Sequence, residues 1–97
     1  MIDGFEWDAE KNAENRRKHG IAFEEATVIW DGPVLTWHDD RFDYGEARET
    51  SIGMLGITAV LTVSHTDRDG TRRIISARKA TKSERRDYHA HLERTLG

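Results

Sequence analysis

The 97-residue sequence predicts an α+β fold, and its patterning carries three signals for that class. Apolar residues recur at helical spacing near the N-terminus, alternate at strand spacing through the middle, and return to helical spacing at the end. The expected order is a short N-terminal strand, two helices, a four-stranded antiparallel meander and a C-terminal helix. A chain of this length supports one modest core, so we expect a single domain over residues 1–97.

The first strand and the first helix are marked by a capping residue and a glycine. Phe5-Glu6-Trp7 alternates apolar and polar side chains, and Asp8 is a favourable N-cap for a helix over residues 9–19. Gly20 stands where helices commonly end. The helix has only a thin apolar stripe, mainly Ala9 and Ala13, so we expect tertiary packing to hold it in place.

A second helix is predicted over residues 23–30, where core-type side chains recur at helical spacing. These side chains are Phe23, Ala26, Thr27 and Trp30. Gly32-Pro33 ends the helix. Residues 34–38 and 47–55 are predicted strands, separated by a polar loop.

The strongest strand signal covers residues 57–65. We expect one face of this strand to belong to the core, namely the face of Ile57, Ala59, Leu61 and Val63. Asp69-Gly70 is a tight-turn dipeptide that leads into a further strand over residues 72–79, forming an antiparallel hairpin. Strict alternation in that strand places Arg73 and Arg78 on opposite faces.

The last helix begins at a capping box. Thr81 and Glu84 have the T-x-x-E spacing in which each residue satisfies a backbone N–H of the other. The apolar side of this helix is expected to consist of Tyr88, Leu92 and Leu96.

Composition limits the possible functions. The chain has no cysteine, which excludes disulfides, thiolate metal sites and cysteine nucleophiles. No segment has the pattern of a secretion signal or the length of a membrane span, so we expect a cytoplasmic protein with no membrane partner. No nucleotide-binding, protease or esterase motif occurs. The histidine and aspartate pairs lack metal-site spacing, so no metal or other cofactor is expected.

The charge is unevenly distributed along the chain. Residues 1–70 hold seven Lys or Arg against fifteen Asp or Glu, whereas residues 71–97 hold eight against three. Guanidinium groups bind phosphate oxygens in pairs, and tyrosine or histidine can stack on a base or move a proton. The basic C-terminal segment is therefore a candidate RNA-binding site, through Arg73, Arg78, Lys79, Lys82, Arg85 and Arg86. Alternatively, it is a solvated basic surface.

Four segments in register resemble the BrnT toxin family along nearly the whole chain. They are FEWDAEKNAENRRKHGIAFEEA, GEARETSIG, the strand ending in SHT, and RRIISARKATKSERRDY. The resemblance implies a RelE-like ribonuclease fold and a type II toxin that stops translation by cutting RNA. It also implies a BrnA-like antitoxin, a toxin–antitoxin heterotetramer, and contact with DNA only through the antitoxin.

The family pattern maps onto particular residues of this chain. It falls on Lys18, His19, Gly20, Phe23, Glu24, Ala26, Glu46, Arg48, Ile52, Gly53, His65, residues 75–80, Arg85 and Tyr88. Of these, Lys18 is assigned to RNA binding with the basic segment.

Metal-free RNA cleavage needs a base for the 2′-hydroxyl, cations for the phosphorane and an acid for the leaving oxygen. Arg48 and Arg78 are the candidates for stabilising the phosphorane. Glu46 or His19 is the candidate base, and Tyr88 or His19 the candidate acid.

Several residues of the family pattern also have a structural interpretation. Glu46 can pair with Arg48, His19 can cap a helix, His65 can satisfy a turn, and Tyr88 can belong to the core. The three tryptophans, Trp7, Trp30 and Trp37, are expected in the core. The alternative function is a non-catalytic binding module, such as a transcriptional co-repressor, that contacts DNA or an acidic partner.

Overall fold

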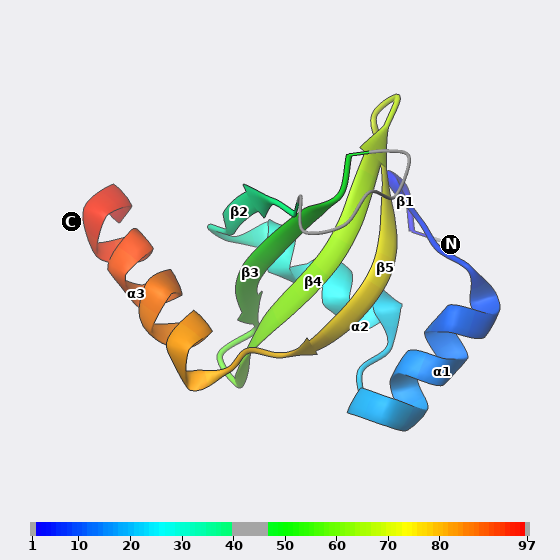
Figure 1. The fold of residues 1–97 in the computed structure, drawn as a ribbon, viewed down its shortest axis with the longest axis horizontal. Coiled ribbons are helices and arrows are strands. Elements are labelled where there is room, and N and C mark those ends of the chain that lie inside the picture. Colours follow the sequence, from blue (N-terminus) through cyan, green and yellow to red (C-terminus); the bar gives the residue numbers. More distant parts are fainter. Residues whose placement is uncertain (1, 40–46, 97) are drawn as a thin grey trace.

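The computed structural model describes residues 2–39 and 47–96. Its strands are β1 (Phe5–Glu6), β2 (Leu35–His38), β3 (Glu49–Leu55), β4 (Ala59–Arg68) and β5 (Thr71–Lys79). They form one sheet in the order β1-β5-β4-β3-β2 (Figure 1). Strands β2 to β5 pair antiparallel with their neighbours, and β1 pairs parallel with β5. The α+β class is confirmed, and the parallel strand makes the sheet mixed.

The helical elements are α1 (Ala9–His19), α2 (Phe23–Ala26), the 3-10 helix η1 (Thr27–Asp31) and α3 (Lys82–Leu96). The helix expected over residues 23–30 is therefore split after one α-helical turn. Residues 27–29 are all β-branched, which disfavours continuation of the α-helix and accompanies the change to 3-10 geometry. Within the described residues, no helix has the length and apolar character needed to span a membrane.

Two apolar clusters lie on opposite faces of the sheet. The larger one joins β4 and β5 to α2 and η1, and its buried members are Ile21, Phe23, Ala26, Ile29, Leu61, Val63, Ile74 and Ala77. The smaller one joins β3 and β4 to α3, and its buried members are Ile52, Val60, Ala80 and Tyr88. In Figure 1, α2 lies behind the strands, α1 lies at one edge and α3 at the other.

A buried amide, and not an apolar stripe, anchors α1. Ala9 and Ala13 are exposed, while Asn15 is buried. Its Nδ2 donates to the carbonyls of Ile21 at 2.9 Å and Ala77 at 2.8 Å, and its Oδ1 accepts from the Ala77 N–H at 3.1 Å. Tertiary contacts hold α1 in place, as expected. The expectation that Ala9 and Ala13 supply an apolar stripe is wrong, because hydrogen bonds from Asn15 to the backbone dock the helix.

The caps predicted for α1 and α3 are confirmed. Asp8 accepts hydrogen bonds from two backbone N–H groups in the first turn of α1, and Gly20 ends that helix with a φ of 70°. At α3, the Thr81 N–H donates to Glu84 Oε1 at 2.8 Å and the Glu84 N–H donates to Thr81 Oγ1 at 3.2 Å.

An extra residue interrupts the pairing of β5 with β4. Ser64 pairs with Ser76, but His65 pairs with Ile74, so Ile75 has no counterpart on β4. A bulge of this kind moves the side chains beyond it to the opposite face of the sheet.

The bulge brings the two arginines of β5 onto one face. Arg73 pairs with Thr66 and Arg78 pairs with Thr62, and these threonines lie on the same face of β4. The expectation that Arg73 and Arg78 lie on opposite faces is wrong, because the alternation is reversed at Ile75.

Ile57 does not belong to the core. It lies in the turn before β4 and is 96% exposed. The preceding Gly56 has a φ of 59°, which ends β3 and separates Ile57 from the alternation of the next strand. Leu61 and Val63 are buried as expected.

Gly53 is required by the close approach of η1 to β3. A Cβ at this position would lie 2.7 Å from Ile29 Cβ and 3.1 Å from Val34 Cγ1. We predict that Gly53→Ala lowers the free energy of unfolding by about 1–3 kcal/mol through overpacking. Chemical denaturation measures the effect. Gly32→Ala is the matched control, because Gly32 has an extended φ of −129° and its Cβ would meet nothing within 4 Å. Equal stability of the two variants would contradict the packing argument.

Candidate functional site

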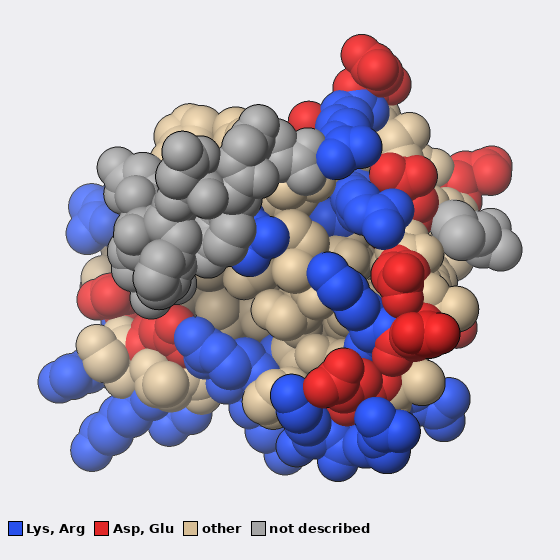
Figure 2. Space-filling view, turned by 45° about the vertical axis from the view of Figure 1, so that its right-hand side comes forward, with Lys and Arg blue, Asp and Glu red and all other residues tan. Residues whose placement is uncertain are grey.

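One face of the sheet carries hydroxyl and guanidinium groups on three neighbouring strands. Residues directly opposite each other in an antiparallel pair share a face, so the register defines this surface. We name it the polar face, and it consists of Thr50, Thr62, Ser64, Thr66, Arg73, Ser76 and Arg78. Its threonines are buried, whereas its serines and arginines are partly exposed. Figure 2 shows basic side chains, with acidic ones among them, around an area of neutral residues.

The buried Thr66 contributes an unsatisfied hydroxyl to the polar face. Among the described residues, its Oγ1 has no hydrogen-bond partner. A buried polar group in this state costs about 1–3 kcal/mol.

Arg78 is fixed by a carboxylate of α3. Its Nη1 and Nη2 donate to Glu84 Oε1 and Oε2 at 2.7 and 2.9 Å. Glu84 Oε1 also accepts from Thr62 Oγ1 at 3.1 Å, in addition to its capping bond from the Thr81 N–H. The hydrogen bonds from Arg78 lower the pKa of Glu84 to about 2, although burial opposes them. Arg78 is therefore held in place while 42% of its side chain stays exposed.

The other two arginines near the polar face are positioned by β1 and by the start of β3. Arg73 Nη1 lies 3.7 Å from Glu6 Oε1. Arg48 directly precedes β3, and its carbonyl accepts from the Asp39 N–H at 2.8 Å. Continued alternation along the chain places Arg48 on the same side of the sheet as Thr50. The structure thus places Arg73 and Arg78 on one side of the sheet, and continued alternation is consistent with Arg48 on that side as well.

Lys18 and His19 lie at the edge of the sheet, at the end of α1. Together with Ser76 and Ile75 they line a groove of about 280 Å³ between α1 and β5. Both side chains are exposed, and Lys18 Nζ pairs with Glu14 at 2.9 Å. Ser76 lines this groove and is also a member of the polar face.

Tyr88 belongs to the core and not to an accessible site. It lies on α3, its ring is fully buried against the sheet, and its hydroxyl donates to the Pro33 carbonyl at 2.8 Å. Burial raises the pKa of this hydroxyl. These contacts support the structural interpretation of Tyr88 over a role as general acid. Glu46, the other candidate base, lies outside the described residues.

The remaining predicted RNA-binding cations are exposed around α3 and the end of β5. They are Lys79, Lys82, Arg85 and Arg86. Lys79 pairs with Leu61 and so lies on the face opposite the polar face. Arg85 Nη1 donates to the Ala80 carbonyl at 3.0 Å, which ties it to the start of α3.

On the opposite face, a buried chain of hydrogen bonds crosses the sheet. Thr36 Oγ1 lies 2.7 Å from Ser51 Oγ, and Ser51 Oγ lies 2.7 Å from His65 Nε2. His65 Nδ1 lies 3.0 Å from Asp67 Oδ1, and Arg72 binds both oxygens of Asp67 at 3.0 Å. Because a carboxylate only accepts, the neutral imidazole carries its proton on Nδ1.

The order of groups in this chain is that of a Ser-His-Asp triad, but the serine cannot meet a substrate. Ser51 and His65 are 0% and 1% exposed, and the ring of Trp30 packs edge-on against His65 at 5.0 Å. The chain therefore joins four strands as a structural network, which supports the structural interpretation of His65.

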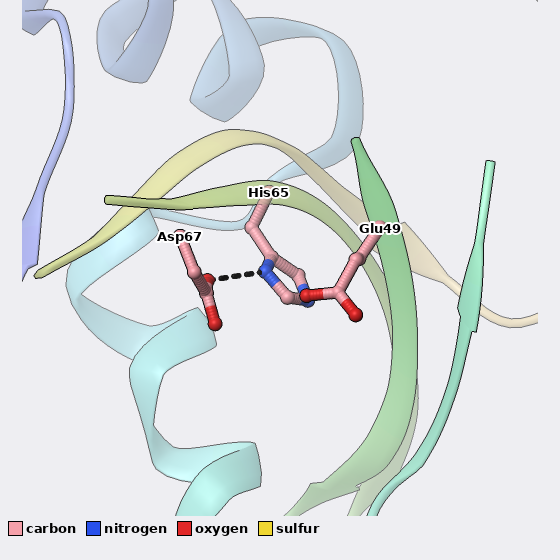
Figure 3. A group of neighbouring side chains, drawn as sticks. All are labelled: Glu49, His65 and Asp67. Carbon is pink, nitrogen blue, oxygen red and sulfur yellow. Dashed lines mark hydrogen bonds and ion pairs between the residues drawn. The ribbon is translucent and has the colours of Figure 1, made fainter. Parts of the chain in front are cut away.

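Glu49, His65 and Asp67 form the one group in the described part of the chain that is close enough to hold a metal ion (Figure 3). Their candidate ligand atoms lie within 4.8 Å of one another. However, both His65 nitrogens are engaged in hydrogen bonds, and Arg72 donates hydrogen bonds to both carboxylate oxygens of Asp67. A cation here would have to replace these contacts, so the present arrangement favours the hydrogen-bonded chain.

Sequence reasoning missed the hydroxyl groups of the polar face and the role of Glu84. Thr62, Ser64 and Thr66 follow one another at strand spacing, a pattern that could have indicated a polar face. The capping box identified Glu84, but no sequence signal connects that residue to Arg78.

The fold and the site define a small α+β protein whose sheet presents arginines and hydroxyl groups on one face. The family model that matches residues 7–84 is described as ribonuclease toxin, BrnT, of type II toxin–antitoxin systems. The chain belongs to this family, and the family activity is that of a ribonuclease toxin.

A solved structure agrees with this assignment at the level of the fold. The crystal structure of the Brucella abortus ribonuclease toxin BrnT superposes with a TM-score of 0.59 and 23% sequence identity. The match covers 78% of this chain and 94% of that chain. No curated protein sequence matches the chain.

We predict that acid destabilises the fold through His65. Burial lowers the pKa of His65 below the ordinary value of 6.5, so the unfolded chain takes up protons before the folded one. The stability contributed by neutral His65 is present above pH 6.5 and is lost as the pH falls below it. In His65→Gln, which cannot titrate, the loss of unfolding free energy between pH 7.5 and 5.5 should be smaller. Chemical denaturation across this range tests it, and equal losses in both proteins would disprove it.

Proposed function

We propose that this BrnT-family toxin cleaves RNA on the polar face without a metal ion. The observation that carries the proposal is that Arg73 and Arg78 share one face of the sheet with hydroxyl groups, and alternation along the chain adds Arg48 to that side. Two of these arginines are held by carboxylates, which prepares them to meet phosphate oxygens with little further ordering. We also propose that the fold is RelE-like, as the sequence resemblance implies.

In the proposed reaction, the ribose 2′-oxygen attacks the adjacent phosphorus. The 2′-hydroxyl proton passes to a base, the bond from phosphorus to the 5′-oxygen breaks, and an acid protonates that leaving oxygen. The products are a 2′,3′-cyclic phosphate and a free 5′-hydroxyl. Arg48 and Arg78 stabilise the negative charge that develops on the phosphorane.

His19 is the described candidate for proton transfer, since it borders the groove that reaches Ser76. Glu46 remains the alternative base. Tyr88 is left out because its hydroxyl is committed to Pro33 in the core. Substrate binding is assigned to Lys18, Arg73, Lys82, Arg85 and Arg86, while Lys79 is left out because it lies on the other face.

The antitoxin is proposed to be BrnA-like and to inhibit by covering the basic side of the polar face. The family is one of toxin–antitoxin pairs, which implies such a partner. Exposed Arg85 and Arg86 on α3 would attract an acidic segment of the antitoxin. We propose a heterotetrameric complex that acts in the cytoplasm and contacts DNA only through the antitoxin.

Arg48→Ala and Arg78→Ala should each reduce RNA cleavage on the order of 10²–10³-fold, because each removes a donor to the transition state. The wild-type protein should cleave RNA in EDTA and leave cyclic phosphate ends. Cleavage of a labelled RNA, with analysis of its ends, measures both effects. Arg94→Ala removes an exposed arginine in the last turn of α3 and serves as the control of equal charge.

Three outcomes decide the proposal. Full activity of both site variants at wild-type stability would contradict the site. A requirement for added Mg²⁺ with 5′-phosphate ends would contradict the mechanism. RNA binding without any cleavage would favour the non-catalytic binding module.

Charge reversal on α3 should weaken antitoxin binding. Arg85→Glu removes one cation from the proposed interface, and the affinity for a coexpressed antitoxin should fall in a salt-dependent manner. Titration calorimetry at two salt concentrations measures the change, with Arg17→Glu on α1 as the control. A complex of unchanged affinity that still binds RNA on the polar face would show that inhibition is not occlusion.

A further inference from the structure

Four large apolar side chains are exposed in the described part of the chain, and one of them, Trp37, is aromatic. It lies on the edge strand β2 and is 41% exposed. The two other tryptophans pack against the larger core cluster, where Trp7 meets the ring of Phe23 and Trp30 meets Phe5 and His65. The expectation that all three tryptophans are core residues is therefore wrong for Trp37.

The register places Trp37 on the same side of the sheet as the polar face. Trp37 pairs with Thr50, Thr50 with Ser64, and Ser64 with Ser76, so the four residues form one row across β2 to β5. With neighbouring strands about 4.8 Å apart, the Trp37 backbone lies roughly 14 Å from that of Ser76. Arg78 occupies the adjacent row on β5, two positions along the strand from Ser76. The row therefore has an aromatic ring at one end, and its other end at Ser76 lies beside the row of Arg78.

Packing explains only part of this placement. An indole that stays 41% exposed leaves part of its large apolar surface in water, and that part does not stabilise the fold. By contrast, it offers a planar surface next to hydroxyl groups and within a few strand spacings of fixed arginines. Single-stranded RNA carries the groups that complement both features. Its phosphates bind arginine, and its unpaired bases stack on aromatic rings.

We propose that Trp37 is a stacking subsite for an unpaired base of the RNA substrate, on a nucleotide near the one whose phosphate meets Arg78. The proposal rests on the proposed function, since it assumes that the polar face binds RNA. It specifies the substrate further: the bound segment is single-stranded, because a base paired within a duplex cannot lie flat on the indole. Trp37 acts in binding and takes no part in the proton transfers.

Substitutions at position 37 separate stacking from simple apolar contact. Trp37→Phe keeps a planar ring, whereas Trp37→Leu keeps an apolar side chain without one. Loss of one stacked base should raise KM for a single-stranded oligonucleotide about tenfold in Trp37→Leu, with the change in KM and not in kcat. Trp37→Phe should stay within about threefold of the wild type. Val28→Ala removes part of an exposed apolar side chain on η1, across the sheet from the polar face, and should have no effect.

A binding measurement supports the kinetic one. An oligonucleotide with 2′-O-methyl groups cannot be cut by attack of the 2′-oxygen, so its Kd reports binding alone. The Kd of the single-stranded oligonucleotide should rise about tenfold in Trp37→Leu. The same oligonucleotide annealed to its complement should bind the wild type and the variant with equal Kd.

The outcomes distinguish this inference from the proposed function. If Arg78→Ala loses cleavage while Trp37→Leu keeps wild-type KM and Kd, the ribonuclease site stands and the stacking subsite is overturned. If Trp37→Leu loses only antitoxin affinity, Trp37 belongs to a protein interface and the inference is likewise overturned. If the wild-type protein neither binds nor cuts RNA, the proposed function itself fails. Thermal unfolding of each variant confirms that the substitutions leave the fold intact.

Discussion

The bulge at Ile75 determines which side chains of β5 face the polar face. Without the extra residue, Arg73 would turn toward the side of α2 and η1, and only Arg78 would remain beside the hydroxyl groups. With it, Ile74 and Ala77 both enter the larger apolar cluster, while Arg73, Ser76 and Arg78 share the other side. One inserted residue thus satisfies the core on one face and assembles a cationic surface on the other. Bulges often occur beside functional sites for this reason.

The acidic residues near the polar face do more than offset its charge. Glu84 caps α3, accepts from Thr62 and grips Arg78, so the docking of the last helix and the aim of this arginine depend on the same carboxylate. Glu6 has a similar relation to Arg73, across the parallel pairing of β1 with β5. An arginine held in this way loses less side-chain entropy when it meets a phosphate. The basic C-terminal segment is therefore a set of positioned cations as well as a solvated charged surface.

Periodicity and capping predicted most of the elements because these signals are local. Asp8, Gly20 and the Thr81–Glu84 pair act within one helical turn, and each is found where the sequence indicated. The failures come from non-local causes. Asn15 is a polar residue that anchors α1 only because the backbone of β5 lies beside it, and Ile57 is exposed only because β3 turns early at Gly56. No composition or spacing marks Ile75 as the extra residue in its strand.

The same limit applies to the candidate site. Arg48, Arg73 and Arg78 were identified by residue type and by the family pattern, which do not depend on geometry. Tyr88, a candidate acid or core residue, is buried, and Trp37, which was expected in the core, is 41% exposed. Hydrophobicity alone cannot make this distinction. Burial depends on which neighbouring element covers a side chain: Tyr88 packs against Ile52 and Val60 of the sheet, whereas Trp37 lies on an edge strand.

The net charge of −3 would oppose RNA binding if charge acted only through the whole molecule. At physiological ionic strength, however, salt screens exposed charges beyond about 8 Å, so acidic residues farther away than this contribute little at the polar face. Glu6 and Glu84 lie close to Arg73 and Arg78 and reduce the local positive field, so the proposed RNA complex relies mainly on directed hydrogen bonds and stacking. Directed contacts depend on the shape of the ligand, whereas a diffuse field attracts any polyanion. An acidic member of a ribonuclease family can therefore bind RNA through a small, ordered surface, at the cost of the long-range attraction that a basic protein has.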